Sequence, residues 1–360
     1  MMNLCLLPRL CLVLLCTFLA LSGRAQAEPV VDSLAFSPDG RLLAVGAHGS
    51  QGAQITGQEL RLYEVATGRR RWAATSKASA PALAAFSPDG SRVVLATRPQ
   101  AGVTGQVTVW EIATRRPVLE LTLEKQEQLT ALAFSPDGKA LMLGTNLISG
   151  QTQIGAVKHF DMARGELQQT VLTLEVTPQS LTYSSDGSAL VGVMALAHNL
   201  TDKGAEVIFW NTADYSIKQR ISLGDVAVHQ IAFTPDLKRA ALTTNKLKTT
   251  EAALVFWDLE TQAFVRPALP AGGIVTALHF SPDQKQLIVS GKRQPDKQAH
   301  LWILDATTGA LVREFGLGYV VEGEHATAFT PDGQDLAIVD ELNTIELRSL
   351  EDGALIRVFE

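Results

Sequence analysis

The chain alternates short runs of small or apolar residues with polar turn signals. In the first stretch, between residues 31 and 75, the runs are VDSLAF, RLLAVGA, ELRLYEV and RRRWAAT. Short runs that alternate in polarity, or that are rich in β-branched and aromatic residues, are typical of β-strands. The pattern therefore predicts four strands, which we call a to d, joined by turns.

An aromatic residue followed by Ser-Pro-Asp-Gly, or by a close variant, ends each strand a. Seven copies occur, with successive spacings of 50, 48, 49, 50, 47 and 49 residues. A second motif, such as VWEIATR or FWDLETQ, follows in phase within strand c. This repetition predicts an all-β fold, a seven-bladed β-propeller with four antiparallel strands per blade. The motif aromatics are Phe36, Phe86, Phe134, Tyr183, Phe233, Phe280 and Phe329.

The repeat leaves no linker for a second domain. The last run, ALIRVFE at 354–360, is in phase as strand d of the seventh blade. We therefore expect the ring to close without N-terminal strand exchange, with blade 7 meeting blade 1 through side-chain packing alone. A single propeller is expected over residues 28–360, with blades at about 30–80, 81–126, 127–175, 176–225, 226–273, 274–323 and 324–360.

The repeated aspartate could be a catalytic group or part of a turn. Ser, Pro, Asp and Gly in this order are typical of a type I turn, in which proline presets φ and glycine accepts a positive φ. Seven such turns lie on a ring at the far ends of the a–b hairpins, so their carboxylates do not converge. We interpret them as structural. Leu237 and Gln284 replace the glycine in two copies, at a cost of about 1 kcal/mol each if the left-handed geometry is kept.

Alanine usually precedes the motif aromatic. It stands at residues 35, 85, 133, 232 and 328, whereas Thr182 and His279 are the exceptions. Small side chains suit the crowded region near the axis, where the blades converge. This position is predicted to be packed and not to form a pocket.

These motifs resemble those of bacterial seven-bladed WD40-type propellers. The shared marks are the Phe-Ser-Pro-Asp-Gly turn and an aromatic-acidic pair in strand c, as in Trp257-Asp258 and Trp110-Glu111. The resemblance implies the fold, and it covers nearly the whole chain after residue 27. The Gly-His pair before strand a is missing, so the family's Asp-His-Ser-Trp network is not carried over. Lactonase-like and TolB-like propellers remain alternatives.

Residues 1–27 differ from the rest of the chain. An early arginine, a leucine-rich run and small residues at Ala25 and Ala27 are typical of a cleaved secretory signal peptide. We expect export to the bacterial periplasm or the extracellular space. An uncut membrane anchor is the alternative, although the apolar run is short for a membrane span. No later segment is apolar enough to cross a membrane.

Charge and cysteine content narrow the classes of partner. The chain has 31 basic and 37 acidic residues, and removing Arg9 and Arg24 with the signal leaves a net charge of −8. This acidity disfavours nucleic acid as a partner. All three cysteines, Cys5, Cys11 and Cys16, lie in the signal, so no disulfide stabilises the exported protein. No GxSxG, HExxH or CxxC motif occurs, and no cofactor is expected.

Length variation falls in the b–c connections, which share what we call the top face, whereas the SPDG turns lie on the bottom face. Six of these connections are long, beginning with AHGSQGAQITGQ at 47–58. Repeated insertions on one face are typical of a binding surface, so we expect a non-catalytic platform for a protein or peptide partner; longer hairpins with polar tips are the alternative. Basic residues in blades 5 and 6 could attract an acidic partner, although solvated loop charge is the alternative. These are Lys246, Lys248, Lys292, Arg293 and Lys297.

The rival hypothesis is an enzyme. Asp32 and His325 occupy the same register in strands a of blades 1 and 7, and Glu324 adjoins them. A histidine between carboxylates can bind a metal or transfer protons. A lactonase-like hydrolase with a divalent metal at the axial mouth is therefore the alternative.

Overall fold

The computed structural model describes most of the chain as β-structure. The described residues are 29–51, 54–76, 82–97, 104–149, 152–174, 176–196, 204–224, 226–246, 252–266, 274–293, 298–320, 326–340 and 342–360. Across these ranges the regular elements are 28 strands, and the part of the chain described contains no helix that could span a membrane. The predicted signal peptide lies outside them.

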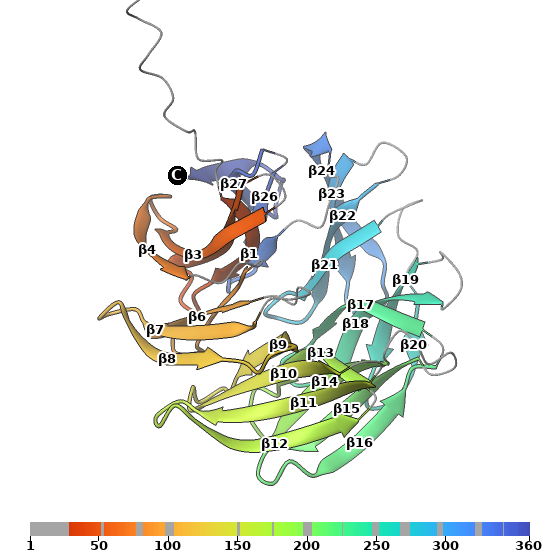
Figure 1. The fold of residues 1–360 in the computed structure, drawn as a ribbon. Helices are drawn as coiled ribbons and strands as arrows, with labels where there is room; N and C mark the ends of the chain where they lie inside the picture. The colour runs from red at the N-terminus through yellow and green to blue at the C-terminus, as the bar shows by residue number, and fades with distance from the viewer. Residues whose placement is uncertain are drawn as a thin grey trace, which may run out of the picture.

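The strands form seven sheets arranged around an axis (Figure 1). Each sheet contains four consecutive antiparallel strands, so the predicted fold class is confirmed. The blades are β1 (Val30–Phe36), β2 (Leu42–Gln51), β3 (Gln54–Glu64), β4 (Arg70–Ser76); β5 (Ala82–Phe86), β6 (Arg92–Thr97), β7 (Gln106–Glu111), β8 (Arg116–Thr122); β9 (Glu127–Phe134), β10 (Ala140–Ser149), β11 (Thr152–Asp161), β12 (Glu166–Leu174); β13 (Val176–Tyr183), β14 (Ala189–Leu196), β15 (Ala205–Asn211), β16 (Ile217–Ser222); β17 (Val226–Phe233), β18 (Arg239–Lys246), β19 (Ala252–Asp258), β20 (Phe264–Val265); β21 (Ile274–Phe280), β22 (Gln286–Lys292), β23 (Gln298–Asp305), β24 (Leu311–Val320); and β25 (Thr327–Phe329), β26 (Asp335–Val339), β27 (Ile345–Ser349), β28 (Leu355–Phe359).

The hydrophobic core is divided among the interfaces between neighbouring blades. Each of seven clusters of buried side chains takes its members from two adjacent blades, and together the clusters close the circle. Between blades 5 and 6, for example, Phe256 packs in one cluster with Trp302. Because each face is buried by its neighbour, a single domain can grow beyond the size that one core permits.

The SPDG turns carry the same hydrogen bonds in every blade. In the first, the Ser37 hydroxyl donates to Asp39 at 2.6 Å, and the Asp39 carboxylate accepts from the backbone N–H of Arg41 at 3.1 Å. The serine or threonine to aspartate bond recurs at 2.6 Å in the other six. Such bonds favour the charged carboxylate: the Ser184 hydroxyl and the Ser188 backbone N–H lower the pKa of Asp186 to about 2. The structural interpretation is confirmed.

Two turns keep the left-handed conformation without glycine. Leu237 has φ 55° and Gln284 has φ 59°, close to the φ of 68° that Gly40 has at the equivalent position. These two turns therefore carry the expected backbone strain.

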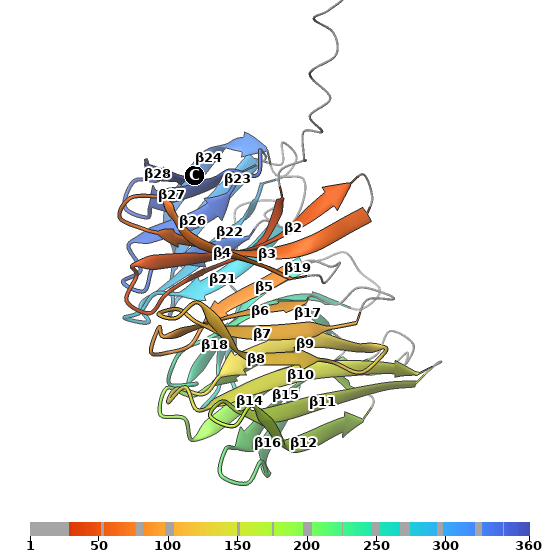
Figure 2. The ribbon, with the colours of Figure 1, turned by 60° about the vertical axis from the view of Figure 1, so that its left-hand side comes forward.

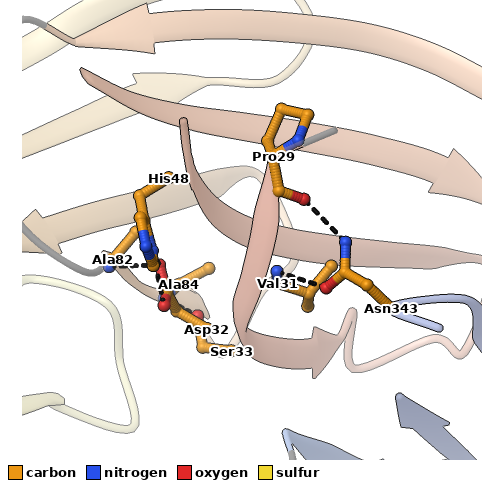
Figure 3. Close-up of polar contacts among 8 residues, drawn as sticks. All are labelled: Pro29, Val31, Asp32, Ser33, His48, Ala82, Ala84 and Asn343. Carbon is orange, nitrogen blue, oxygen red and sulfur yellow. Dashed lines mark hydrogen bonds and ion pairs between the residues drawn. The ribbon is translucent and has the colours of Figure 1, made fainter. Parts of the chain in front are cut away.

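The ring closes without strand exchange, as predicted, because the sheet of blade 7 contains only β25 to β28. The expectation that side-chain packing alone joins blade 7 to blade 1 is wrong. The Asn343 amide oxygen accepts from the Val31 backbone N–H at 2.8 Å, and its amide nitrogen donates to the Pro29 carbonyl at 2.7 Å (Figure 3). The backbone N–H of Glu360 also donates to the Gly68 carbonyl at 3.1 Å. Strand a pairs with a neighbouring strand on one side only. The backbone N–H and C=O groups on its other side would be left without partners, which explains why such bonds form.

We expect Asn343→Ala to lower the free energy of unfolding by about 2 kcal/mol. The variant loses two hydrogen bonds, leaves the Val31 N–H without its acceptor, and places alanine at φ 64°. Urea unfolding measures the loss. Asn343→Gly, which tolerates this φ, isolates the hydrogen bonds, and an unchanged stability in both variants would contradict the role of Asn343 in closure.

Candidate functional site

Two b–c hairpins extend the top face. In blade 1, β2 pairs with β3 through Gly49↔Gly57 and Gln51↔Gln54, whereas β1 pairs with β2 only as far as His48. In blade 3, the pairing of β10 with β11 continues to Ser149↔Thr152. Figure 2 shows both paired ends projecting on the same side of the ring. The sequence left binding loops and longer hairpins as alternatives here, and much of the two insertions is paired strand.

Asp32, the first candidate catalytic residue, joins blade 1 to blade 2. Its two carboxylate oxygens each lie 2.8 Å from Nδ1 of His48, and one of them accepts from the Ala82 backbone N–H at 2.8 Å (Figure 3). The next residue, Ser33, accepts from the Ala84 N–H at 2.9 Å. Asp32 and Ser33 therefore bind the unpaired edge of β5, just as Asn343 binds the edge of β1.

The other two members of the predicted metal-binding or catalytic group, His325 and Glu324, lie outside the described residues. Within the ranges that the structure describes, no group of three or more His, Cys, Asp or Glu residues is placed to hold a metal ion. The contacts of Asp32 with His48 and Ala82 explain its position, because they join blade 1 to blade 2.

The basic residues proposed for partner binding lie in adjacent blades. Lys246 ends β18 opposite Val226, and Lys292 ends β22 opposite Ile274, so both occupy the last position of a strand b. Arg293 follows, with its guanidinium 3.4 Å from a Glu314 carboxylate oxygen. This ion pair neutralises part of the predicted basic patch. Lys248 and Lys297 lie outside the described residues.

A cavity of about 390 Å³ lies against the strands a of blades 4 to 6. Thr182, Ala232 and His279 line it, together with prolines of the bottom turns. The prediction that this position in the repeat is packed and forms no pocket is therefore wrong for these three blades. Alanine signals small volume, but sequence cannot show whether neighbouring strands fill the space that a small side chain leaves.

The cavity makes His279 a source of acid sensitivity. Although the His279 side chain is exposed to the cavity, partial desolvation by the surrounding strands lowers its pKa from the ordinary 6.5 to about 4. The unfolded chain therefore binds a proton near pH 6.5 that the folded chain binds only near pH 4, so stability falls as pH decreases through this window. Because solvent in the cavity also reaches the ring, we expect this loss to be only about 1 kcal/mol.

Thermal melting of wild type and His279→Ala at pH 7 and pH 4 measures the effect. We expect the wild type to lose more stability on acidification than the variant. Carboxylates contribute equally to both proteins, so equal losses would contradict a neutral His279 in the fold.

Comparison with known proteins agrees with this architecture. Residues 19–51 match the family described as "WD domain, G-beta repeat", and the described part of this match comprises β1, the first turn and β2. No curated protein sequence matches the chain. Among solved structures, a chain of Kuenenia stuttgartiensis hydrazine synthase is similar over 91% of this chain and 98% of its own, with a TM-score of 0.67 and 16% identity. At that identity the likeness shows the fold alone. The repeated motifs and the seven four-stranded blades identify the chain as a seven-bladed β-propeller, whose first blade matches a WD40 repeat.

Proposed function

We propose that this protein is an exported, non-catalytic platform that binds a protein or peptide partner through its top face. The observation that carries the proposal is the pair of projecting hairpins in blades 1 and 3. Three residue pairs of blade 1, from Gly49↔Gly57 to Gln51↔Gln54, extend beyond strand a, which corresponds to a projection of about 10 Å.

Paired strands suit this role better than loops of the same length. Their backbones are already ordered by cross-strand hydrogen bonds, so a partner that binds them loses less conformational entropy on association. Between the two hairpins lies blade 2, whose strands β6 and β7 have six residues each. A partner would therefore contact two separate points of a rigid ring.

The engagement of Asp32 supports a non-catalytic role. A carboxylate that accepts from His48 and from the Ala82 N–H already holds blades 1 and 2 together. Using it as a metal ligand or a base would disturb that contact. Export rests on residues 1–27, whose pattern is that of a secretory signal.

The basic residues indicate which chemistry one part of the partner would have. Lys246 and Lys292 end equivalent strands of neighbouring blades at the rim of the same face. An acidic segment of the partner would bind here, and an association rate that falls with increasing salt is the expected signature.

Crosslinking in the native envelope, followed by identification of the captured proteins, tests the platform. In the test variant, residues 49–57 and 147–154 are each replaced by Asn-Gly, which closes both hairpins with type I′ turns. We expect capture of the partner to fall at least about tenfold, which corresponds to about 1.4 kcal/mol of binding.

Arg41→Ser is the matched control. The Arg41 side chain is 84% exposed, and the residue follows a turn of the bottom face, which is opposite the hairpins. Capture should be unchanged in this control. If a correctly folded variant with short hairpins captured the same proteins in the same yield, the platform would not be the top face.

A further inference from the structure

The axial cavity on the bottom face is separate from the proposed platform. Its walls are the inner edges of β13, β17 and β21, and its rim is formed by Pro235, Pro282 and Pro331 of the bottom turns. A volume of about 390 Å³ falls within the usual range for small-molecule pockets, about 300–1,000 Å³.

Two positions of the repeat are altered where the cavity lies. The residue before the motif aromatic is alanine in five blades but Thr182 in blade 4 and His279 in blade 6. Ala232, in the blade between them, keeps the small side chain and also lines the cavity. The change therefore places polar groups on two walls and leaves space between them.

These polar groups have no partner in the described part of the protein. The hydroxyls of Ser180 and Thr182 and the ring nitrogens of His279 make no hydrogen bond there, although all three residues line the cavity. Two other hydroxyls of the lining are engaged, because Ser281 donates to Asp283 and Thr330 to Asp332, each at 2.6 Å. Ser180, Thr182 and His279 thus supply both donors and acceptors for a bound molecule.

The His279 ring is held in a fixed orientation. It stacks on Phe329 of the next blade, with ring centroids 4.8 Å apart and planes 15° apart. Leu181, Ile231 and Phe233 provide apolar walls in the same cavity. A flat, partly apolar molecule can therefore contact these walls while its polar end reaches the unpartnered groups.

The lining disfavours charged ligands. Among the described residues, the lining contains Ser, Thr, Leu, Ile, Ala, Phe, Pro and His, and no Asp, Glu, Lys or Arg. The His279 side chain is exposed to the cavity, and desolvation by the surrounding strands favours its neutral form, since it lowers the pKa of the ring to about 4. A cation or an anion would lose its hydration without gaining an opposite charge.

We propose that this cavity binds an uncharged planar ring compound that carries a carboxamide-like donor and acceptor, held by Ser180, Thr182 and His279. The site would function independently of the top face, so a soluble small molecule and a protein partner could be bound together.

Three probes of matched shape test the charge and the hydrogen-bonding chemistry: benzamide is uncharged, benzoate is an anion, and benzamidinium is a cation. Binding to the full chain is followed by the NMR signals of the histidine rings at neutral pH. We expect benzamide to shift the His279 signals with a dissociation constant on the order of 1 mM. Benzoate and benzamidinium should bind at least about tenfold more weakly.

Two variants assign the site. Thr182→Val keeps the shape of the side chain but removes its hydroxyl, and His279→Ala introduces the residue that most other blades carry at this position. Each should weaken benzamide binding by roughly fivefold to tenfold, as expected for a lost hydrogen bond. In the His279→Ala protein, ligand-observed signals replace the missing ring signals. His229→Ala is the control, because this exposed histidine of β17 lies outside the lining.

The proposal is overturned if benzamide does not bind, if all three probes bind with the same affinity, or if Thr182→Val binds benzamide as the wild type does. Thr182→Val retains the packing volume of threonine, so this comparison holds even if His279→Ala were to fold poorly. None of these results bears on capture of a partner by the top face, so the two proposals fail separately.

Discussion

Deletion of residues 354–360 is expected to unfold the whole ring. The deletion removes β28, the fourth strand of blade 7. Phe359 of this strand is buried and packs edge-on against Tyr63 of blade 1, with ring centroids 5.8 Å apart. The deletion also removes the Glu360 N–H that donates to Gly68. It therefore opens the interface on which closure depends.

Each blade buries its faces only against its neighbours, so an open ring leaves two blade faces exposed. We expect the melting transition to fall by more than about 15 °C or to lose its cooperativity, which circular dichroism measures. Replacing Leu355 and Ile356 by serine is the control, because these side chains are 49% and 45% exposed. That protein should melt close to the wild type. A truncated protein with an unchanged melting temperature would show that β28 is dispensable for the ring.

Lys158→Met is expected to cost about 3–5 kcal/mol of unfolding free energy. The Lys158 ammonium lies 2.6 Å from a Glu127 carboxylate oxygen, and the two side chains are only 16% and 5% exposed. Burial alone would raise the pKa of Glu127, but the bond to Lys158 and the other hydrogen bonds outweigh it and lower that pKa. Without Lys158 the carboxylate is left buried without its counter-charge.

Urea unfolding at two pH values tests this pair. The deficit of the variant should shrink as pH falls from neutral, because burial raises the pKa of Glu127 once Lys158 is absent, and protonation then removes the uncompensated charge. The double variant Glu127→Gln Lys158→Met should recover most of the lost stability. Lys139→Met serves as the control, since this 83% exposed lysine pairs with Asp137 at 3.5 Å on the surface and should cost less than about 1 kcal/mol. Equal losses at Lys139 and Lys158 would contradict the buried pair.

The fold could be predicted because its signals repeat. Spacing of the Ser-Pro-Asp-Gly turns and the in-phase strand c aromatics gave the number of blades without any tertiary information. A turn is a local structure, so its residues specify it directly, and the turn geometry is kept even where Leu237 and Gln284 replace the glycine. The fourth strand of the seventh blade could be predicted from ALIRVFE because this segment is in phase with the repeat.

Contacts between blades could not be predicted in the same way. Asn343 occurs once in a connection of ordinary appearance, and its partners Pro29 and Val31 lie more than 300 residues away in the chain. A register shift between Val31 and Ser33 places Asp32 beside His48, whereas ideal alternation along the strand does not specify that contact. Both side chains act as hydrogen-bonding substitutes for a missing neighbouring strand.

The sequence left the hairpins as one of two alternatives and missed the cavity, for different reasons. The stretch AHGSQGAQITGQ has the glycine and polar content of a loop, yet its ends continue the pairing of β2 and β3. Cross-strand pairing of a preceding hairpin can override such a local preference. The cavity depends on the distance between strands a around the axis, which no single repeat encodes.

The bottom turns are expected to stabilise the ring, and the top hairpins are expected to bind the partner. Parallel measurement of melting temperature and partner capture tests this most directly, in Asp137→Ala and in the variant with short hairpins at 49–57 and 147–154. We expect the turn variant to melt at a lower temperature while it retains capture, because in the described part of the chain Asp137 bonds to its own turn, through Ser135 and Lys139. The hairpin variant should melt close to the wild type and lose capture. Loss of capture in a turn variant with an unchanged melting temperature would contradict the account.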